Sequence, residues 1–126
     1  HIYDGKGATG PSAVMGIVEQ FPDIPIVCAH WGGGLPFYAL MPEVAAVLSN
    51  TYLDTAASPL LYHQSVFSVV PQLMRRDAIL LGSDYPLLRL ERLIRQVEKS
   101  SLTEEDKQAI LGGNAQKLLG LDGYSL

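Results

Sequence analysis

Residues 26–34 read Ile-Val-Cys-Ala-His-Trp-Gly-Gly-Gly: four apolar residues, a histidine, and then a turn rich in glycine. A short continuous apolar run is typical of a strand that is buried on both faces in a parallel sheet. The pattern recurs at residues 51–54, Thr-Tyr-Leu-Asp, and at residues 78–84, Ala-Ile-Leu-Leu-Gly-Ser-Asp. Three strands are therefore predicted, over residues 26–29, 51–53 and 78–81, and an ionisable residue ends or follows each of them.

Segments with helical periodicity separate these strands. The first helix has apolar residues at positions i, i+3, i+4 and i+7, namely Val14, Ile17, Val18 and Phe21. A second helix spans residues 37–48, and Pro42 predicts a break in it near Met41. Strands that alternate with helices predict an α/β fold with a parallel sheet and right-handed crossovers.

Two further helices are predicted near the C-terminal end of the chain, after one over residues 90–97. Thr103 is a suitable N-cap for the first of them, with Asp106 three residues on as a weak capping box. The pair Gly112-Gly113 predicts its end, and Asn114 is expected to cap one last turn.

Composition sets limits on the class of protein. The 126 residues suit one domain, and 48% of them are hydrophobic, which favours a globular core. The net charge is −4 with no basic stripe, so nucleic acid is not an expected partner. No apolar run is long enough to span a bilayer, and no signal or transit peptide is visible. The single cysteine, Cys28, is expected to be buried, and a cytoplasmic protein is the simplest expectation.

The residues at the strand ends are His30, Asp54 and Asp84, and such ends line the binding site in parallel α/β folds. His30 can act as a general base or metal ligand, or it can simply bond a loop carbonyl. Asp84 can bind a cation, or it can form an Asx-turn or an N-cap for the next helix. Asp54 is the weaker candidate because its surroundings also suit a turn. His63 is expected on a helix, exposed to solvent.

The segments at residues 26–37, 52–55, 79–86 and 110–115 together resemble the amidohydrolase-related family, which includes aminocarboxymuconate-semialdehyde decarboxylase and related barrel hydrolases. The first of them continues from the glycines as Leu-Pro-Phe, and the third reads Ile-Leu-Leu-Gly-Ser-Asp-Tyr-Pro. Order and spacing agree as well as wording, and the likeness covers nearly the whole chain.

The resemblance implies that the three strands are the sixth to eighth of a (β/α)₈ barrel. It implies that His30 activates metal-bound water or assists proton transfer and that Asp84 is a metal ligand, so both are expected catalytic residues. The implied cofactor is a divalent metal ion, with zinc as the first expectation, and the implied partner is a small-molecule substrate. Trp31, Tyr85 and His1 are the expected substrate contacts.

The resemblance also implies that residues 1–126 are the C-terminal part of one barrel domain. The family's His-x-His metal ligands on strand one have no counterpart here, and its strand-five histidine is expected upstream of His1. A whole barrel takes about 250 residues. We therefore expect a fragment that is inactive alone, that holds metal weakly or not at all, and that forms a homo-oligomer to cover its open sheet edges.

Two other interpretations stay open. The glycines at 32–34 could hold phosphate at the start of a helix in an open nucleotide-binding sheet, although neither the dinucleotide fingerprint nor the P-loop spacing is present. The chain could also be a non-catalytic assembly module with an inherited site. Within the family, the sequence does not decide between hydrolysis and non-oxidative decarboxylation.

Overall fold

The computed structural model describes residues 9–121 and residue 123. Its centre is a parallel sheet of three strands, β1 (Ile26–Cys28), β2 (Thr51–Asp54) and β3 (Ile79–Leu80), in the order β1-β2-β3. Ile26 pairs with Thr51, and Leu53 pairs with Ile79. The predicted α/β class and parallel sheet are confirmed, and the carboxyl ends of all three strands share one edge.

Two strands are shorter than predicted. Ala29 does not extend β1 because its carbonyl accepts a hydrogen bond from the Gly32 N–H at 3.0 Å, which begins a turn. This turn, η1, spans His30–Gly34. Ala78 lies in a second short turn, η3 (Arg76–Ala78), which leads directly into β3.

The helices before β2 follow the predicted pattern. The helix α1 spans Pro11–Gln20 and precedes β1. After η1, the helical segment is divided into α2 (Leu35–Tyr38) and α3 (Pro42–Val47), and η2 (Leu48–Asn50) leads into β2. The predicted break near Met41 is confirmed, since proline suits the first turn of a helix and not its interior.

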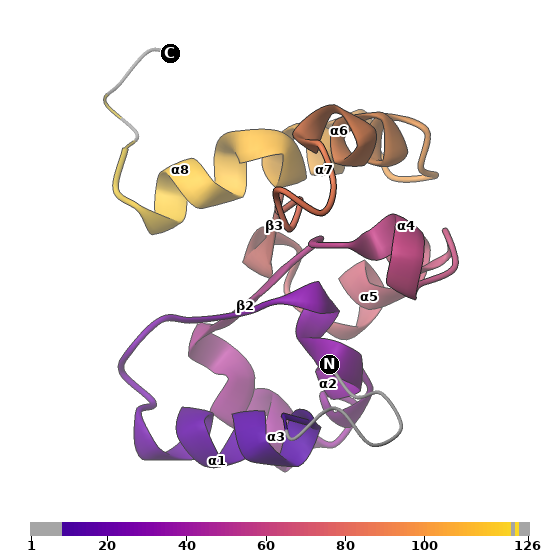
Figure 1. Cartoon of the computed structure of the whole chain (residues 1–126). Helices are drawn as coiled ribbons and strands as arrows, with labels where there is room; N and C mark the ends of the chain where they lie inside the picture. The colour runs from indigo at the N-terminus through magenta and orange to yellow at the C-terminus, as the bar shows by residue number, and fades with distance from the viewer. Residues whose placement is uncertain (1–8, 122, 124–126) are drawn as a thin grey trace.

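Helices also connect β2 to β3 and follow β3. The first connection contains α4 (Ser58–Leu61) and α5 (Val66–Leu73), and α6 (Leu90–Glu98) follows β3. In Figure 1, α6, α7 (Glu104–Gln108) and α8 (Asn114–Leu118) lie together beside β3, whereas α1 and α3 lie beyond the opposite side of the sheet.

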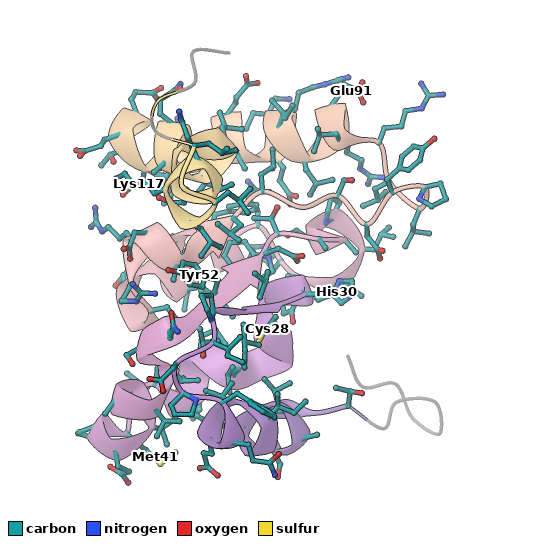
Figure 2. All side chains as sticks on the ribbon, turned by 90° about the vertical axis from the view of Figure 1, so that its left-hand side faces the viewer. Cys28, His30, Met41, Tyr52, Glu91 and Lys117 are labelled. Atoms are coloured by element: carbon teal, nitrogen blue, oxygen red, sulfur yellow. The ribbon has the colours of Figure 1, made fainter. Side chains whose placement is uncertain are left out.

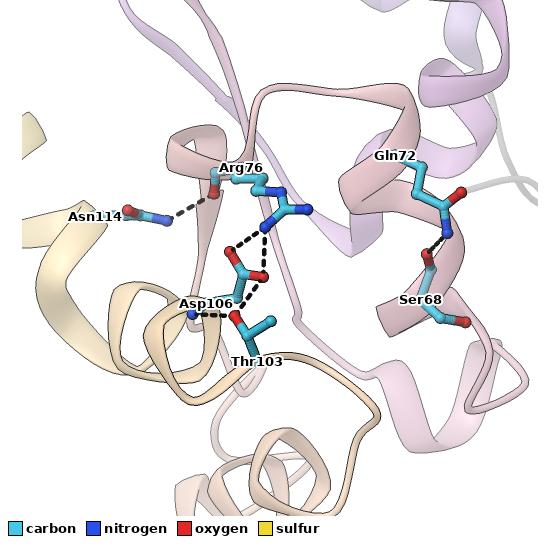
Figure 3. Close-up of polar contacts among 6 residues, drawn as sticks. All are labelled: Ser68, Gln72, Arg76, Thr103, Asp106 and Asn114. Carbon is cyan, nitrogen blue, oxygen red and sulfur yellow. Dashed lines mark hydrogen bonds and ion pairs between the residues drawn. The ribbon is translucent and has the colours of Figure 1, made fainter.

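The predicted N-cap of α7 is confirmed. The Thr103 hydroxyl accepts the Asp106 N–H at 3.1 Å and donates to the Asp106 carboxylate at 2.8 Å (Figure 3). The same carboxylate accepts from the Arg76 guanidinium at 2.9 Å. This contact joins α7 to the turn before β3.

The predicted end of this helix at Gly112-Gly113 is confirmed. The helical backbone breaks within η4 (Ala109–Gly113), where Gly112 has φ 177° and ψ −27°, and α8 begins after this kink at Asn114. The predicted cap at Asn114 is wrong, because its side chain is buried and donates to the carbonyls of Arg76 at 3.0 Å and Ile79 at 2.8 Å. A tertiary contact therefore holds the first residue of α8 against β3.

The core lies between the sheet and the helices. Its largest fully buried side chains include Trp31, Phe67, Leu35, Leu53 and Ile79. Cys28 is buried as predicted. Burial is the main cause that raises the pKa of its thiol, and the nearby charge of Asp54 adds to it. No helix in the described part of the chain is both long and apolar enough to span a membrane.

One prediction about β1 is wrong: the strand is buried on one face only. Cys28 is 7% exposed, whereas Val27, whose side chain points the opposite way, is 49% exposed. By contrast, both residues of β3 are buried. The described helices therefore leave one face of the β1 edge uncovered.

Candidate functional site at the carboxyl edge of the sheet

The carboxyl edge of the sheet collects the ionisable residues that follow the strands. Asp54 is the last residue of β2, and His30 and Asp84 follow β1 and β3. Because the strands are parallel, all three residues stand at the same edge. In Figure 2, His30 lies beyond the arrowhead of β1.

His30 is held by hydrogen bonds at its main-chain N–H, at its carbonyl and at its imidazole ring. Its N–H donates to Asp54 Oδ1 at 2.9 Å, and its carbonyl accepts from the Tyr62 hydroxyl at 2.8 Å. Its ring atom Nδ1 lies 3.1 Å from the Ala56 carbonyl oxygen. A carbonyl only accepts, so Nδ1 carries a hydrogen, and in the neutral ring Nε2 carries the lone pair. His30 is half-buried.

Asp54 organises this edge. Its Oδ1 accepts the Ala56 N–H at 2.9 Å, two residues on, which is the Asx-turn that its sequence context suggested. The same oxygen holds the His30 N–H, a link that the sequence did not indicate.

The edge of β2 is also tied to the loop after β3. The buried Thr55 hydroxyl donates to the Gly82 carbonyl at 3.0 Å and accepts the Gly82 N–H at 3.1 Å. A Cβ at position 82 would lie 3.0 Å from Asp54 Cγ. A larger residue at position 82 would therefore need the Asp54 side chain to shift.

Asp84 is exposed, with a left-handed backbone at φ 66°. Its carbonyl accepts the Leu87 N–H at 2.8 Å, but its carboxylate makes no hydrogen bond or ion pair within residues 9–121. The cap interpretation fails because α6 begins only at Leu90, with Arg89 as its N-cap residue. The carboxylate is thus available for another role.

The three expected substrate contacts lie in different surroundings. Tyr85 is 79% exposed next to Asp84. Trp31 is 1% exposed: its Nε1 donates to Ser58 Oγ at 2.6 Å, and its ring meets Phe67 edge-on at 5.0 Å. This burial gives Trp31 a packing role and does not support substrate contact. His1 lies outside the described residues.

His63 lies partly where it was expected, and Tyr62 is a residue that the sequence did not indicate. His63 is exposed as expected, but it lies in the loop between α4 and α5 and its Nδ1 pairs with Ser65. Tyr62, beside it, was not singled out because no motif surrounds it; burial raises the pKa of its hydroxyl. Only the folded chain shows its bond to His30, a residue 32 positions away.

A metal site is not complete within the described residues. No group of three or more His, Cys, Asp or Glu side chains in residues 9–121 could hold an ion. His30 borders a mainly apolar cavity of about 260 Å³ beside β1, and Asp84 is not among the residues that line it. The predicted pair thus shares an edge of the sheet but not this cavity.

The chain is similar in sequence to two decarboxylases. The chain is 28% identical to 2-amino-3-carboxymuconate-6-semialdehyde decarboxylase of Dictyostelium discoideum, over 85% of the chain and 34% of that protein. It is 24% identical to gamma-resorcylate decarboxylase of Polaromonas sp. strain JS666, over 85% of the chain and 37% of that protein. The chain therefore spans about a third of the length of these curated relatives.

The fold is similar to that of solved decarboxylases. The dihydroxybenzoic acid decarboxylase of Polaromonas sp. JS666, solved with manganese and the inhibitor 2-nitroresorcinol, matches with a TM-score of 0.77 and 21% identity, over 97% of this chain and 46% of that one. A putative amidohydrolase from Staphylococcus aureus matches with a TM-score of 0.68 and 28% identity, over 87% of this chain and 39% of that one.

A family model described as Amidohydrolase matches residues 6–121, which is most of the chain. The match includes all three strands and the residues at their carboxyl ends, and it agrees with the resemblance drawn from the motifs. The chain belongs to the amidohydrolase family.

Proposed function

We propose that this chain supplies the carboxyl-edge residues of a metal-dependent, non-oxidative decarboxylase that acts on a carboxylated ring or an acid derived from one. The observation that carries the proposal is that His30 and Asp84 stand at the same edge of a parallel sheet, in an amidohydrolase chain whose curated relatives above are decarboxylases. In the proposal the three strands are the sixth to eighth of a (β/α)₈ barrel.

The described residues fit a divalent metal ion only in part. Asp84 offers an exposed carboxylate, which suits a hard or borderline cation, but a catalytic site needs about three protein ligands. The proposal therefore takes the other ligands from outside residues 9–121. A bound cation supplies positive charge beside substrate oxygens. Zinc was the expectation from the motifs, and the manganese of the Polaromonas structure makes that ion an equal candidate.

The proposed role of His30 is proton transfer at the substrate carbon. In decarboxylation the bond from that carbon to the carboxylate breaks, CO₂ leaves with the carboxylate carbon, and the remaining electron pair takes up a proton. With Nδ1–H held by the Ala56 carbonyl, Nε2 is the ring atom that would take up a proton from solvent and, from the imidazolium so formed, donate it to that carbon. Asp84 serves as a metal ligand in this scheme.

Hydrolysis is the second candidate, and the 28% identity to the putative amidohydrolase from Staphylococcus aureus favours keeping it. There, His30 Nε2 would take a proton from the attacking water and return it to the leaving group. Asp84 would keep its role as a ligand. The two candidates therefore differ in the product and not in the residues.

The test uses the longest natural protein that contains this chain, loaded with Mn²⁺ or Zn²⁺. Release of CO₂ from 2,6-dihydroxybenzoate and from 2-amino-3-carboxymuconate-6-semialdehyde is measured beside hydrolysis of simple lactones and amides. We expect CO₂ release; hydrolysis without CO₂ release would select the second candidate, and neither product with either metal would contradict both.

Matched variants test the residue roles. Asp84→Asn should lose bound metal and activity, whereas Asp23→Asn, an exposed aspartate before β1, should keep both. His30→Asn should lower kcat by about 10²–10⁴-fold with metal retained, and His63→Asn should not. An Asp84→Asn variant with normal metal content and turnover would contradict the ligand assignment.

A further inference from the structure

The last residue of β2 and the segment after it contact the imidazole of His30 and its main-chain N–H and carbonyl. Asp54 accepts the His30 N–H, Ala56 accepts from the ring at Nδ1, and the Tyr62 hydroxyl donates to the His30 carbonyl. The distances are 2.9, 3.1 and 2.8 Å. His30 is thus held by residues that lie 24 to 32 positions further along the chain.

The backbone at this point needs such support. His30 and Trp31 both have φ 56°, in the left-handed region that side chains with a Cβ rarely occupy. The Tyr62 bond reaches the peptide group between these two residues. Trp31 is fixed separately by packing in the core and by Ser58.

We propose that Tyr62 is a positioning residue for His30, one whose hydroxyl fixes the carbonyl of the histidine and thereby aims its imidazole. The inference rests on the proposed function, since the proton transfer at Nε2 is part of that function. Rotation of this peptide group would swing the Cα–Cβ bond and pull Nδ1 away from the Ala56 carbonyl. The ring would then lose its orientation and its fixed tautomer together.

Tyr62→Phe tests this inference because it removes the hydroxyl and keeps the ring. In the metal-loaded natural protein we expect kcat to fall by about tenfold to a hundredfold, the range seen when an outer partner of a functional group is removed or its geometry shifts. KM and metal content should stay within about twofold, because Tyr62 is not proposed to touch substrate or metal. Tyr38→Phe is the control, since the Tyr38 hydroxyl makes no hydrogen bond within residues 9–121.

A second measurement is independent of turnover. With ¹⁵N-histidine labelling, His30 is identified by the signal that His30→Asn removes. The natural protein and Tyr38→Phe should show the Nδ1–H tautomer, and Tyr62→Phe should show a mixture of tautomers. Far-UV circular dichroism checks that each variant is folded. An unfolded Tyr62→Phe protein is replaced by the natural protein with tetrafluorotyrosine at its tyrosines, whose hydroxyl ionises at mildly alkaline pH and then no longer donates. The tautomers should then mix, and an unchanged Nδ1–H tautomer would overturn the positioning role.

The outcomes separate this inference from the proposed function. Natural protein without turnover, but with a tautomer change in Tyr62→Phe, would contradict the function and leave the positioning role supported. Normal turnover and an unchanged tautomer in folded Tyr62→Phe would overturn the positioning role and leave the function intact. A higher KM or a lower metal content in Tyr62→Phe, with kcat unchanged, would also overturn the positioning role.

Discussion

At the scale of single residues, close approach decides the shape of the carboxyl edge. Gly82 lies against the Asp54 side chain and exchanges two hydrogen bonds with Thr55. Asp54 in turn holds His30. A change at Gly82 therefore reaches the proposed proton-transfer residue through one intermediate side chain.

We predict that Gly82→Ala destabilises the protein by about 1–3 kcal/mol, as overpacking does elsewhere. The new Cβ would lie 3.0 Å from Asp54 Cγ and 3.1 Å from Oδ2, so the carboxylate has to move. Chemical denaturation measures the change. Gly16→Ala is the control, because nothing lies within 4 Å of its Cβ and alanine favours the interior of α1; it should be neutral or stabilising. Equal stabilities of the two variants would contradict the steric argument.

At the scale of elements, a buried amide helps to hold the C-terminal helices against β3. Asn114 donates to two main-chain carbonyls on either side of the start of β3, those of Arg76 and Ile79. The Arg76 side chain is bound by Asp106 of α7 (Figure 3). The helices after β3 therefore depend on contacts with the strand as well as on their own propensities.

We predict that Asn114→Ala lowers the free energy of unfolding by about 1–3 kcal/mol, because it leaves buried carbonyls without their donor. Thermal or urea unfolding provides the measurement. Gln72→Ala removes one amide contact, made by an exposed side chain of α5 to the Ser68 carbonyl, and should change stability by no more than about 0.5 kcal/mol. If both variants lost the same stability, the proposed link to β3 would be wrong.

At the scale of the whole molecule, the uncovered edge is the main feature. The sheet ends at β1, where Val27 is 49% exposed, and Ile17, Phe21 and Ile24 nearby in sequence are between 49% and 55% exposed. An apolar strand at a sheet edge favours pairing with another chain. The expectation of a homo-oligomer drawn from the sequence stays a prediction, and these exposures support it.

We predict that the 126-residue chain self-associates, with a two-fold dimer as the simplest arrangement, and that it binds less than one metal ion per chain. Light scattering and metal analysis test both parts. Val27→Lys should shift the chain towards monomer, whereas Val69→Lys, at a position 48% exposed on α5, should not. A stable monomer loaded with metal would contradict the prediction.

The sequence alone determined the features that depend on near neighbours in the chain. Apolar runs and helical periodicity predicted the order of elements and the parallel sheet, Pro42 predicted the break between α2 and α3, and Thr103 predicted the start of α7. The motifs around His30 and Asp84 led to the amidohydrolase family. These signals act over a few residues, so they are visible before the chain folds.

Only the tertiary structure decided the features that join distant segments. In the folded chain Trp31 is buried against Phe67, and one face of β1 is uncovered at Val27. Asn114 holds α8 against β3 and does not cap the helix. Folding also brings Tyr62 to the His30 carbonyl. Each of these outcomes depends on which side chain meets which backbone group across the sheet, 24 to 38 residues apart for the hydrogen bonds, and no local pattern encodes such a meeting.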